Sequence, residues 1–294
     1  MKSKFLTLGV MLAGLVGMVS CNKGIEYDDE AKAIENQQSI EKYLADSSIT
    51  ATKDSSGMYY VLRKANPTGA KPKAEEGLTL NFNGYTLDGR LVASSVNTAK
   101  IPFVRPYNLG FLLGGMERAL NILRVGESAT LYMPFYLAYG SYSSDNIPGY
   151  SVIKMNIEVV SSRSEVQQID DFIAVNKLTV SDRSTDNLVI VRNNVVTGDT
   201  LGVGKSVNIA YKGRLLTGAI FDNGDKTYPF TTGTGGTTSG PVIGFDRAIR
   251  KLRKGEKATI IFPSALGYGK GGFQASGVYY IYPYSPISFD VEVL

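Results

Sequence analysis

The chain has 294 residues, which is long enough for two domains of ordinary size. Its formal net charge is +4 and falls to +2 without Lys2 and Lys4, so the surplus is too small and too dispersed to indicate nucleic-acid binding. The sequence has no histidine and a single cysteine, which excludes a Ser-His-Asp or Cys-His catalytic pair and a histidine metal site. We therefore expect no cofactor and no metal.

The first 21 residues indicate a targeting segment that is not part of the fold. Two lysines precede a short apolar run at residues 5–19, and Ser20 and Cys21 follow it. This order is typical of a secretory signal peptide, and residues 18–21 resemble a bacterial lipobox, in which the cysteine is lipidated and becomes the new N-terminus. Because Cys21 is the only cysteine, we predict that it carries a lipid anchor; the alternative is an ordinary cleaved signal peptide.

The predicted anchor determines the predicted location. We expect the protein in the bacterial cell envelope, attached to a membrane through Cys21 and either periplasmic or exposed on the surface. No later apolar run is long enough to span a bilayer. Residues 22–30 are polar and end in three acids, which predicts a solvated tether between the anchor and the first module.

Residues 31–162 predict a helix followed by a β-rich module. The segment 31–45 has a sparse apolar face at helical spacing, which includes Ile34 and predicts the leading helix. The segment 78–83 alternates apolar and polar residues, as half-buried strands do. Gly89 follows an aspartate, and this pair predicts a hairpin turn.

The second part of this module predicts a short helix and two further strands. Residues 116–123 are apolar at helical spacing, and Gly126 is expected to end the helix with a left-handed cap. An apolar strand at 131–133 should end at Pro134, and a last strand should cover 152–159.

The same pattern recurs 129 residues later. Gly-Met-Glu-Arg-Ala-Leu at 115–120 is matched by Gly-Phe-Asp-Arg-Ala-Ile at 244–249, and the offset is constant on both sides of these runs. A constant offset indicates a duplicated domain. We therefore predict fold class α+β with two modules at 31–162 and 163–294, each with a leading helix and a mostly antiparallel sheet covered by one short helix.

A series of short motifs follows in the second module. In chain order they are Tyr211-Lys212-Gly213, Phe221-Asp222, Pro229-Phe230, Val242-Ile243-Gly244-Phe245, Lys254-Gly255-Glu256, Leu266-Gly267-Tyr268-Gly269, Ile281-Tyr282-Pro283 and Phe289-Asp290-Val291-Glu292. Their order and spacing over residues 200–294 resemble the FKBP-type peptidyl-prolyl cis-trans isomerases, and the first module resembles the same family through fewer motifs. The whole chain is similar to tandem-FKBP lipoproteins of Bacteroides-like bacteria.

The resemblance implies a fold and a site. Each module would be a twisted antiparallel sheet wrapped around a short helix, with an apolar, aromatic hollow between the two. In the second module the implied catalytic residues are Tyr211, Phe221, Asp222 and Tyr268. The implied substrate-binding residues are Phe230, Val242, Ile243, Phe245, Ile281 and Phe289, with Phe245 at the floor, where the family usually has Trp. A Gly- and Thr-rich insertion after Phe230 leaves the register of Val242 and Ile243 open by one position.

The first module departs further from the family pattern. Val92-Ala93 stand opposite Phe221-Asp222, so the acid is lost. The residues that would form its degenerate groove are Phe82, Phe103, Met116, Tyr139, Ile147 and Met155. We therefore expect catalysis mainly in the second module.

The implied activity is isomerisation of Xaa-Pro bonds in proline-containing polypeptides, in the service of folding exported proteins. Rotation about the C–N bond makes and breaks no bond, so it needs no nucleophile and no metal. The alternative is a non-catalytic module that binds proline-containing segments as a chaperone, favoured by Val92-Ala93 and by Phe245 in place of Trp. A third interpretation is a surface lipoprotein whose modules are spacers.

Several of these residues also have a purely structural interpretation. Phe221, Phe245 and Phe289 could be ordinary core, and Asp222 could be a solvated acid in a turn. The tyrosine-rich run 279–284 is interpreted as the loop that overhangs the hollow, and the alternative is a peptide- or glycan-binding surface.

Overall fold

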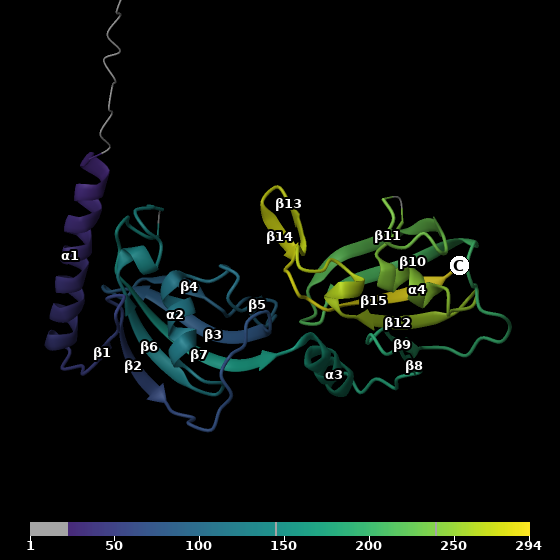
Figure 1. Cartoon of the computed structure of the whole chain (residues 1–294), viewed down its shortest axis with the longest axis horizontal. Helices are drawn as coiled ribbons and strands as arrows, with labels where there is room; N and C mark the ends of the chain where they lie inside the picture. The colour runs from purple at the N-terminus through teal and green to yellow at the C-terminus, as the bar shows by residue number, and fades with distance from the viewer. Residues whose placement is uncertain (1–22, 145, 239) are drawn as a thin grey trace, which may run out of the picture.

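The computed structural model describes residues 23–144, 146–238 and 240–294, which form two β-rich domains arranged along one long axis (Figure 1). The predicted signal peptide and Cys21 lie outside these residues. None of the helices in the described ranges combines the length and the apolar character that crossing a membrane requires. We call the elements α1 to β7 the first domain and the elements α3 to β15 the second domain.

Helix α1 (Lys23–Asp46) confirms the predicted leading helix but begins earlier than expected. The residues predicted as a tether, 22–30, are helical from Lys23 onward. No proline interrupts the stretch, and extending a helix that has already formed adds one hydrogen bond for each residue fixed. Ile34, expected on the apolar face, is exposed.

The first domain is an antiparallel sheet with one short helix against it. Its strands are β1 (Thr52–Lys53), β2 (Tyr59–Lys64), β3 (Gly77–Thr86), β4 (Leu91–Ser94), β5 (Val104–Pro106), β6 (Ser128–Met133) and β7 (Ile153–Arg163). Their order is β1-β2-β6-β7-β3-β4, and β5 also pairs with β3. The helices between them are α2 (Gly114–Ile122) and the 3₁₀ turn η1 (Phe135–Leu137).

The second domain repeats this arrangement. Helix α3 (Glu165–Val175) precedes the strands β8 (Asp182–Arg183), β9 (Val189–Arg192), β10 (Ser206–Leu215), β11 (Ile220–Thr231), β12 (Lys257–Phe262) and β15 (Ile287–Val293). These strands are ordered β11-β10-β15-β12-β9-β8 and are all antiparallel. Helix α4 (Ile243–Ile249) and the 3₁₀ turn η2 (Ser264–Leu266) correspond to α2 and η1, whereas the hairpin β13 (Phe273–Ala275) and β14 (Val278–Ile281) forms a separate two-stranded sheet.

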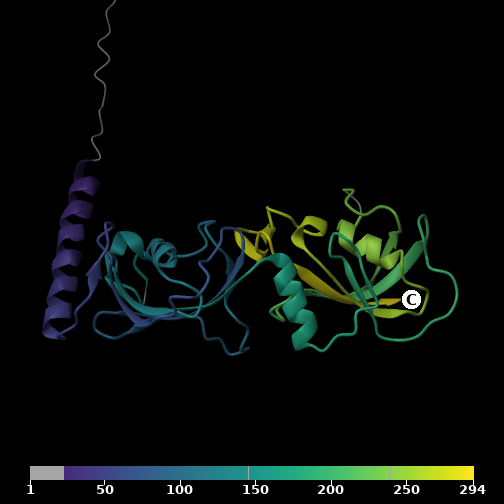
Figure 2. The same ribbon diagram turned by 60° about the horizontal axis from the view of Figure 1, so that its bottom comes forward.

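Period-two alternation lets each sheet bury both faces. In β12, Ile260 and Phe262 join the core that α4 covers, and Ile261 between them joins a cluster on the opposite face with Ile169 of α3. In β6, Met133 joins the core on the α2 side of the sheet, and its neighbour Tyr132 packs with α1 on the opposite face. Each domain therefore has its own core, with the short helix on one face and the leading helix on the other (Figure 2).

The two predicted glycine caps are wrong. Helix α2 ends at Ile122, and Gly126 (φ 86°) lies in the turn that leads into β6, where its N–H donates to the carbonyl of Val159. Gly255 (φ 78°) has the same place before β12. A left-handed glycine serves a tight turn as well as a helix end, so sequence spacing does not separate the two uses. The hairpin predicted at Gly89 (φ 95°) is confirmed between β3 and β4.

The connection between the domains is one residue long. Strand β7 ends at Arg163 and α3 begins at Glu165, so Ser164 alone joins them. Its hydroxyl accepts from the Gln167 N–H while its own N–H donates to the Gln167 side chain, which completes a capping box. The sheet of the first domain thus passes directly into a well-capped helix of the second.

Candidate active site

A hollow of about 190 Å³ lies between the sheet and α4 in the second domain. Aromatic rings make up most of its wall, together with one carboxylate. The lining residues are Tyr211, Asp222, Tyr228, Pro241, Val242, Phe245, Tyr268 and Phe289.

The strand register places these side chains together. Gly213 of β10 is paired with Asp222 on β11 and with Phe289 on β15, so one position joins both walls of the hollow. A Cβ at Gly213 would lie 2.8 Å from the ring of Phe221 and 2.9 Å from that of Phe289. Glycine is therefore what allows the two rings to meet at 5.6 Å over this strand.

The floor of the hollow is Phe245, in the first turn of α4. Its ring is 3% exposed and meets Phe289 at 5.1 Å and Tyr211 at 5.8 Å, both in edge-to-face geometry. Gly244 lets the helix approach β12, because a Cβ there would lie 2.6 Å from the ring of Phe262. The helix thus presents a flat, dry aromatic surface at the position that the family resemblance gave to Phe245.

Asp222 fixes the hydroxyl of Tyr211. The Tyr211 hydroxyl donates a hydrogen bond of 2.8 Å to Oδ2 of Asp222. Burial and then this carboxylate raise the pKa of Tyr211 well above its ordinary value, so the hydroxyl stays protonated and remains a donor. This contact gives Asp222 a definite role that its sequence motif alone did not supply.

Tyr268 supplies a second hydroxyl to the hollow. Burial, and to a smaller extent the charge of Asp222, raises the pKa of this hydroxyl, so it too is neutral and a donor. Its ring packs edge-on against Phe221 at 6.4 Å. Among the described residues its hydroxyl makes no hydrogen bond, which leaves the donor available to a ligand in the hollow.

Four of the ten residues carried over from the family lie outside the lining. Phe221 packs edge-on against Tyr268 and Phe289, Phe230 stacks on Tyr228, and Ile281 is buried in the core. Ile243 is 42% exposed, because it is the first residue of α4 and its side chain lies outside the hollow. In the structure Pro241 and Val242, rather than Val242 and Ile243, line the hollow.

Two lining residues were not predicted. Tyr228 lies two residues before Phe230 on the same face of β11, so strand alternation could have found it. Pro241 directly precedes Val242 and is found only once the helix start is known.

The first domain lacks the hydrogen-bonded pair of this site. Gly84 is paired with Ala93 and with Met155, as Gly213 is paired with Asp222 and Phe289, so the register itself shows that Ala93 replaces the acid. Phe82 stands in the place of Tyr211 and packs edge-on against Phe103 at 4.9 Å. Of the other predicted groove residues, Met116, Ile147 and Met155 are buried, and Tyr139 is half-buried.

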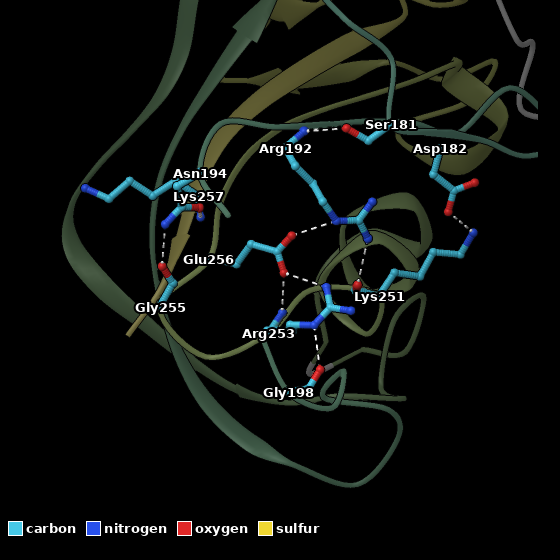
Figure 3. Close-up of polar contacts among 10 residues, drawn as sticks. All are labelled: Ser181, Asp182, Arg192, Asn194, Gly198, Lys251, Arg253, Gly255, Glu256 and Lys257. Carbon is cyan, nitrogen blue, oxygen red and sulfur yellow. Dashed lines mark hydrogen bonds and ion pairs between the residues drawn. The ribbon is translucent and has the colours of Figure 1, made fainter. Parts of the chain in front are cut away.

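A buried charge cluster lies away from the hollow, where β9 meets the turn before β12 (Figure 3). Glu256 is 1% exposed; its Oε1 lies 2.6 Å from Nε of Arg192, and its Oε2 accepts from the backbone N–H of Arg253 at 2.8 Å. Its counterpart Glu127 accepts from the backbone N–H groups of Asn66 and Arg124 instead. This motif glutamate therefore holds the fold rather than the site. Within the described ranges, no three Asp, Glu or Cys side chains gather closely enough to hold a metal ion.

Known proteins were compared with the chain as a whole. The family model described as FKBP-type peptidyl-prolyl cis-trans isomerase matches residues 68–160 and 198–294, well over half of the sequence. The chain therefore belongs to the FKBP-type peptidyl-prolyl cis-trans isomerase family, as the motifs predicted, and it carries two copies of the family domain.

Individual relatives are similar over different spans. Peptidyl-prolyl cis-trans isomerase FKBP9 of Homo sapiens is 28% identical over 272 residues, which cover 91% of this chain and 43% of that protein. The FKBP-type isomerase FkpA of Aeromonas hydrophila is 31% identical over 133 residues, 44% of this chain and 47% of that protein. This chain thus spans less than half the length of either relative. The solved structure of the 3 FKBP domains of wheat FKBP73 is 17% identical with a TM-score of 0.35 and covers 83% of this chain and 98% of that one.

Proposed function

We propose that this protein isomerises Xaa-Pro bonds in polypeptides, and that the hollow of the second domain does the catalysis. The observation that carries the proposal is the hydrogen-bonded pair Tyr211 and Asp222 beside the buried ring of Phe245. At the matching register positions the first domain has Phe82 and Ala93, which carry neither this hydroxyl nor the acid.

The geometry suits a reaction that only rotates a bond. Amide resonance puts negative charge on the carbonyl oxygen and holds the rotation barrier at about 18–20 kcal/mol. In the aromatic hollow, Phe245 and Phe289 exclude water from the proline ring and its carbonyl, so the charge-separated planar amide loses its solvation. The twisted amide is less polar and loses less solvation free energy in the hollow than the planar amide does. The barrier to rotation about the C–N bond is therefore lower.

The polar groups of the site hold the substrate during this rotation. The hydroxyl of Tyr268 donates to a peptide carbonyl, and the backbone N–H of Val242, at the start of α4, donates to a second one. Asp222 keeps the hydroxyl of Tyr211 directed along the wall, so that the hollow has one fixed polar edge. No covalent intermediate is formed, and no proton has to move.

A proline-limited refolding assay on residues 22–294 tests the proposal. The intact protein should accelerate refolding, and Phe245→Ala should abolish most of the acceleration, because it removes the floor of the hollow. Binding of a proline-containing peptide, measured separately by calorimetry, distinguishes the alternative. A protein that binds the peptide tightly but leaves the refolding rate unchanged is a binding module, which is the function that the degenerate first domain supports.

We further propose that the clients are exported proteins and that the chain acts from a lipid anchor at Cys21 in a bacterial cell envelope. The lipobox-like run before Cys21 supports the anchor. Helix α1 is about 36 Å long, at about 1.5 Å for each of its 24 residues, and packs on the first domain through Asn36 and Ile40, so only its N-terminal part would separate the domain from the anchor. Cys21→Ser should move the protein from the membrane fraction to the soluble fraction; a wild-type protein without an acyl group by mass spectrometry would refute the anchor.

A further inference from the structure

The hairpin β13–β14 lies between the first domain and the large sheet of the second domain (Figures 1 and 2). It leaves the second domain just after Tyr268 and returns at Ile281, and it pairs with neither of the two large sheets. Two short strands alone are marginally stable, so the position of the hairpin depends on what its side chains pack against.

One side of the hairpin touches the site. The ring of Phe273, on β13, lies 5.5 Å from the ring of Tyr268, which lines the hollow. Tyr280, on β14, packs on Phe273 at 6.1 Å, and both rings are about half exposed. The hairpin thereby contacts a lining residue of the hollow through one ring.

The other side touches the first domain through Phe111. This residue lies in the loop between β5 and α2, and its ring meets Tyr279 at 5.1 Å and Tyr282 at 5.0 Å, edge-on in both cases. The two tyrosines stack on each other at 5.3 Å. One phenylalanine of the first domain is therefore held against a pair of rings at the base of the hairpin.

Two polar contacts accompany this ring cluster. The guanidinium of Arg105 lies between two rings, 4.3 Å from the centroid of Phe103 and 4.1 Å from that of Tyr282. The hydroxyl of Tyr284 donates to Glu75 at 2.7 Å. Phe111, Arg105 and Glu75 all belong to the first domain, and each contacts a tyrosine of the segment 279–284.

We propose that Phe111 and Arg105 of the first domain are positioning residues for the active site of the second. They hold the hairpin, and the hairpin holds Tyr268 through Phe273. The inference rests on the proposed isomerase function of the hollow. It gives the degenerate first domain a role in catalysis that does not require a substrate in its own groove.

The test uses the full chain from residue 22 and compares Phe111→Ala, Tyr282→Ala and the double variant. Losing one or two aromatic contacts should lower kcat/KM for an Xaa-Pro peptide about three- to tenfold in each single variant. Because both changes release the same hairpin, the double variant should lose no more than the larger single loss. Phe111→Tyr keeps the ring and should retain wild-type activity. Tyr142→Ala is the matched control, since Tyr142 is an exposed aromatic of the first domain that is outside the ring cluster at the hairpin and does not line the hollow.

A spectroscopic readout separates positioning from loss of folding. The chain has no tryptophan, so Tyr280→Trp places a single reporter on β14. In this background Phe111→Ala should lower the anisotropy of the reporter and shift its emission to longer wavelength, with no change in the circular dichroism of the whole protein.

The outcomes differ for the two proposals. Wild-type kcat/KM in Phe111→Ala, or fully additive losses in the double variant, would overturn the positioning role while leaving the isomerase function intact. A wild-type chain without isomerase activity would remove the proposed function instead. In that case the Trp reporter alone tests whether Phe111 holds the hairpin. An unchanged anisotropy in Phe111→Ala would overturn that contact.

Discussion

The hydrogen bond from Tyr211 to Asp222 allows a quantitative prediction for catalysis. Asp222→Ala leaves the hydroxyl of the half-buried Tyr211 without its acceptor. A hydrogen bond to a charged group contributes about 1.5–3 kcal/mol, and the exposure of Asp222 places this one at the lower end. Since about 1.4 kcal/mol corresponds to a factor of ten in rate, we expect kcat/KM to fall about tenfold.

A double-mutant cycle shows whether Asp222 acts through Tyr211. Tyr211→Phe should lower kcat/KM by a similar factor, and the double variant should lose little more than either single variant, because both remove the same contact. The assay is isomerisation of an Xaa-Pro peptide by the full chain. Asp199→Ala, which removes an exposed acid from the loop before β10, is the control for the change in net charge.

The pH dependence gives the same interaction an independent test. The pKa of Tyr211 is raised in the folded protein by burial and by Asp222, so the hydroxyl should remain protonated past the ordinary value of 10.0. Activity should therefore stay level as the pH rises to about 10, whereas in Asp222→Ala the alkaline limit should move down. Losses that simply add in the double variant, with no shift of the alkaline limit, would refute the role assigned to the pair.

Three further predictions concern stability. Glu256→Gln should lower the free energy of unfolding in urea by about 2 kcal/mol, less than for a fully buried pair because Arg192 keeps 27% of its side chain exposed. Gly213→Ala should lower the same quantity by about 1–3 kcal/mol through overpacking against two rings, and the melting temperature of the second domain should fall with it. The Arg247 guanidinium holds the pKa of Asp186 at about 2, below its ordinary 3.8. The ion pair therefore stabilises the fold fully at pH values above 3.8, and this stabilisation is lost as the pH falls through about 2. The melting temperatures of wild type and Asp186→Asn should converge over this interval.

The duplication provides controls for two of these predictions. Glu127→Gln should be milder than Glu256→Gln, because the carboxylate of Glu127 accepts only backbone N–H groups among the described residues. Gly84→Ala should be milder than Gly213→Ala, because a Cβ at Gly84 would meet the flexible end of Met155 at 3.0 Å rather than two rings. Equal losses in the free energy of unfolding in both domains would show that these local contacts do not determine how strongly each substitution destabilises the protein.

Much of the fold could be predicted because it depends on periodic burial. Ile40 and Ile169, which lie 129 residues apart, are both fully buried against their sheets, as matching positions of a repeat should be. The strand ends at Pro134 and the hairpin at Gly89 were also predictable, since each depends on one residue's backbone limits. The start of α1 was missed because a polar run that continues a helix looks like a polar run that does not.

The site was less predictable wherever it depends on which way a side chain points. Tyr211, Asp222 and Phe245 are placed by strand pairing and by the helix face, so their motifs sufficed. Ile243 was misplaced because a shift of one residue at a helix start turns the side chain by about 100° and out of the hollow. The contacts of Phe111 with the second domain had no sequence signal, since they depend on how two separate cores are arranged.

The loop ahead of the short helix has different uses in the two domains, and this difference suggests why the first domain is present. In the second domain Pro241 and Val242 of this loop line the hollow. In the first domain the matching loop carries Phe111, which packs on the tyrosines of the second. With Phe82 and Ala93 in place of Tyr211 and Asp222, the first domain lacks this hydrogen-bonded pair, although Tyr139 keeps a hydroxyl at the position of Tyr268. The first-domain loop that carries Phe111 instead contacts the second domain, and under the positioning proposal the domain without the pair supports the site of the domain that has it.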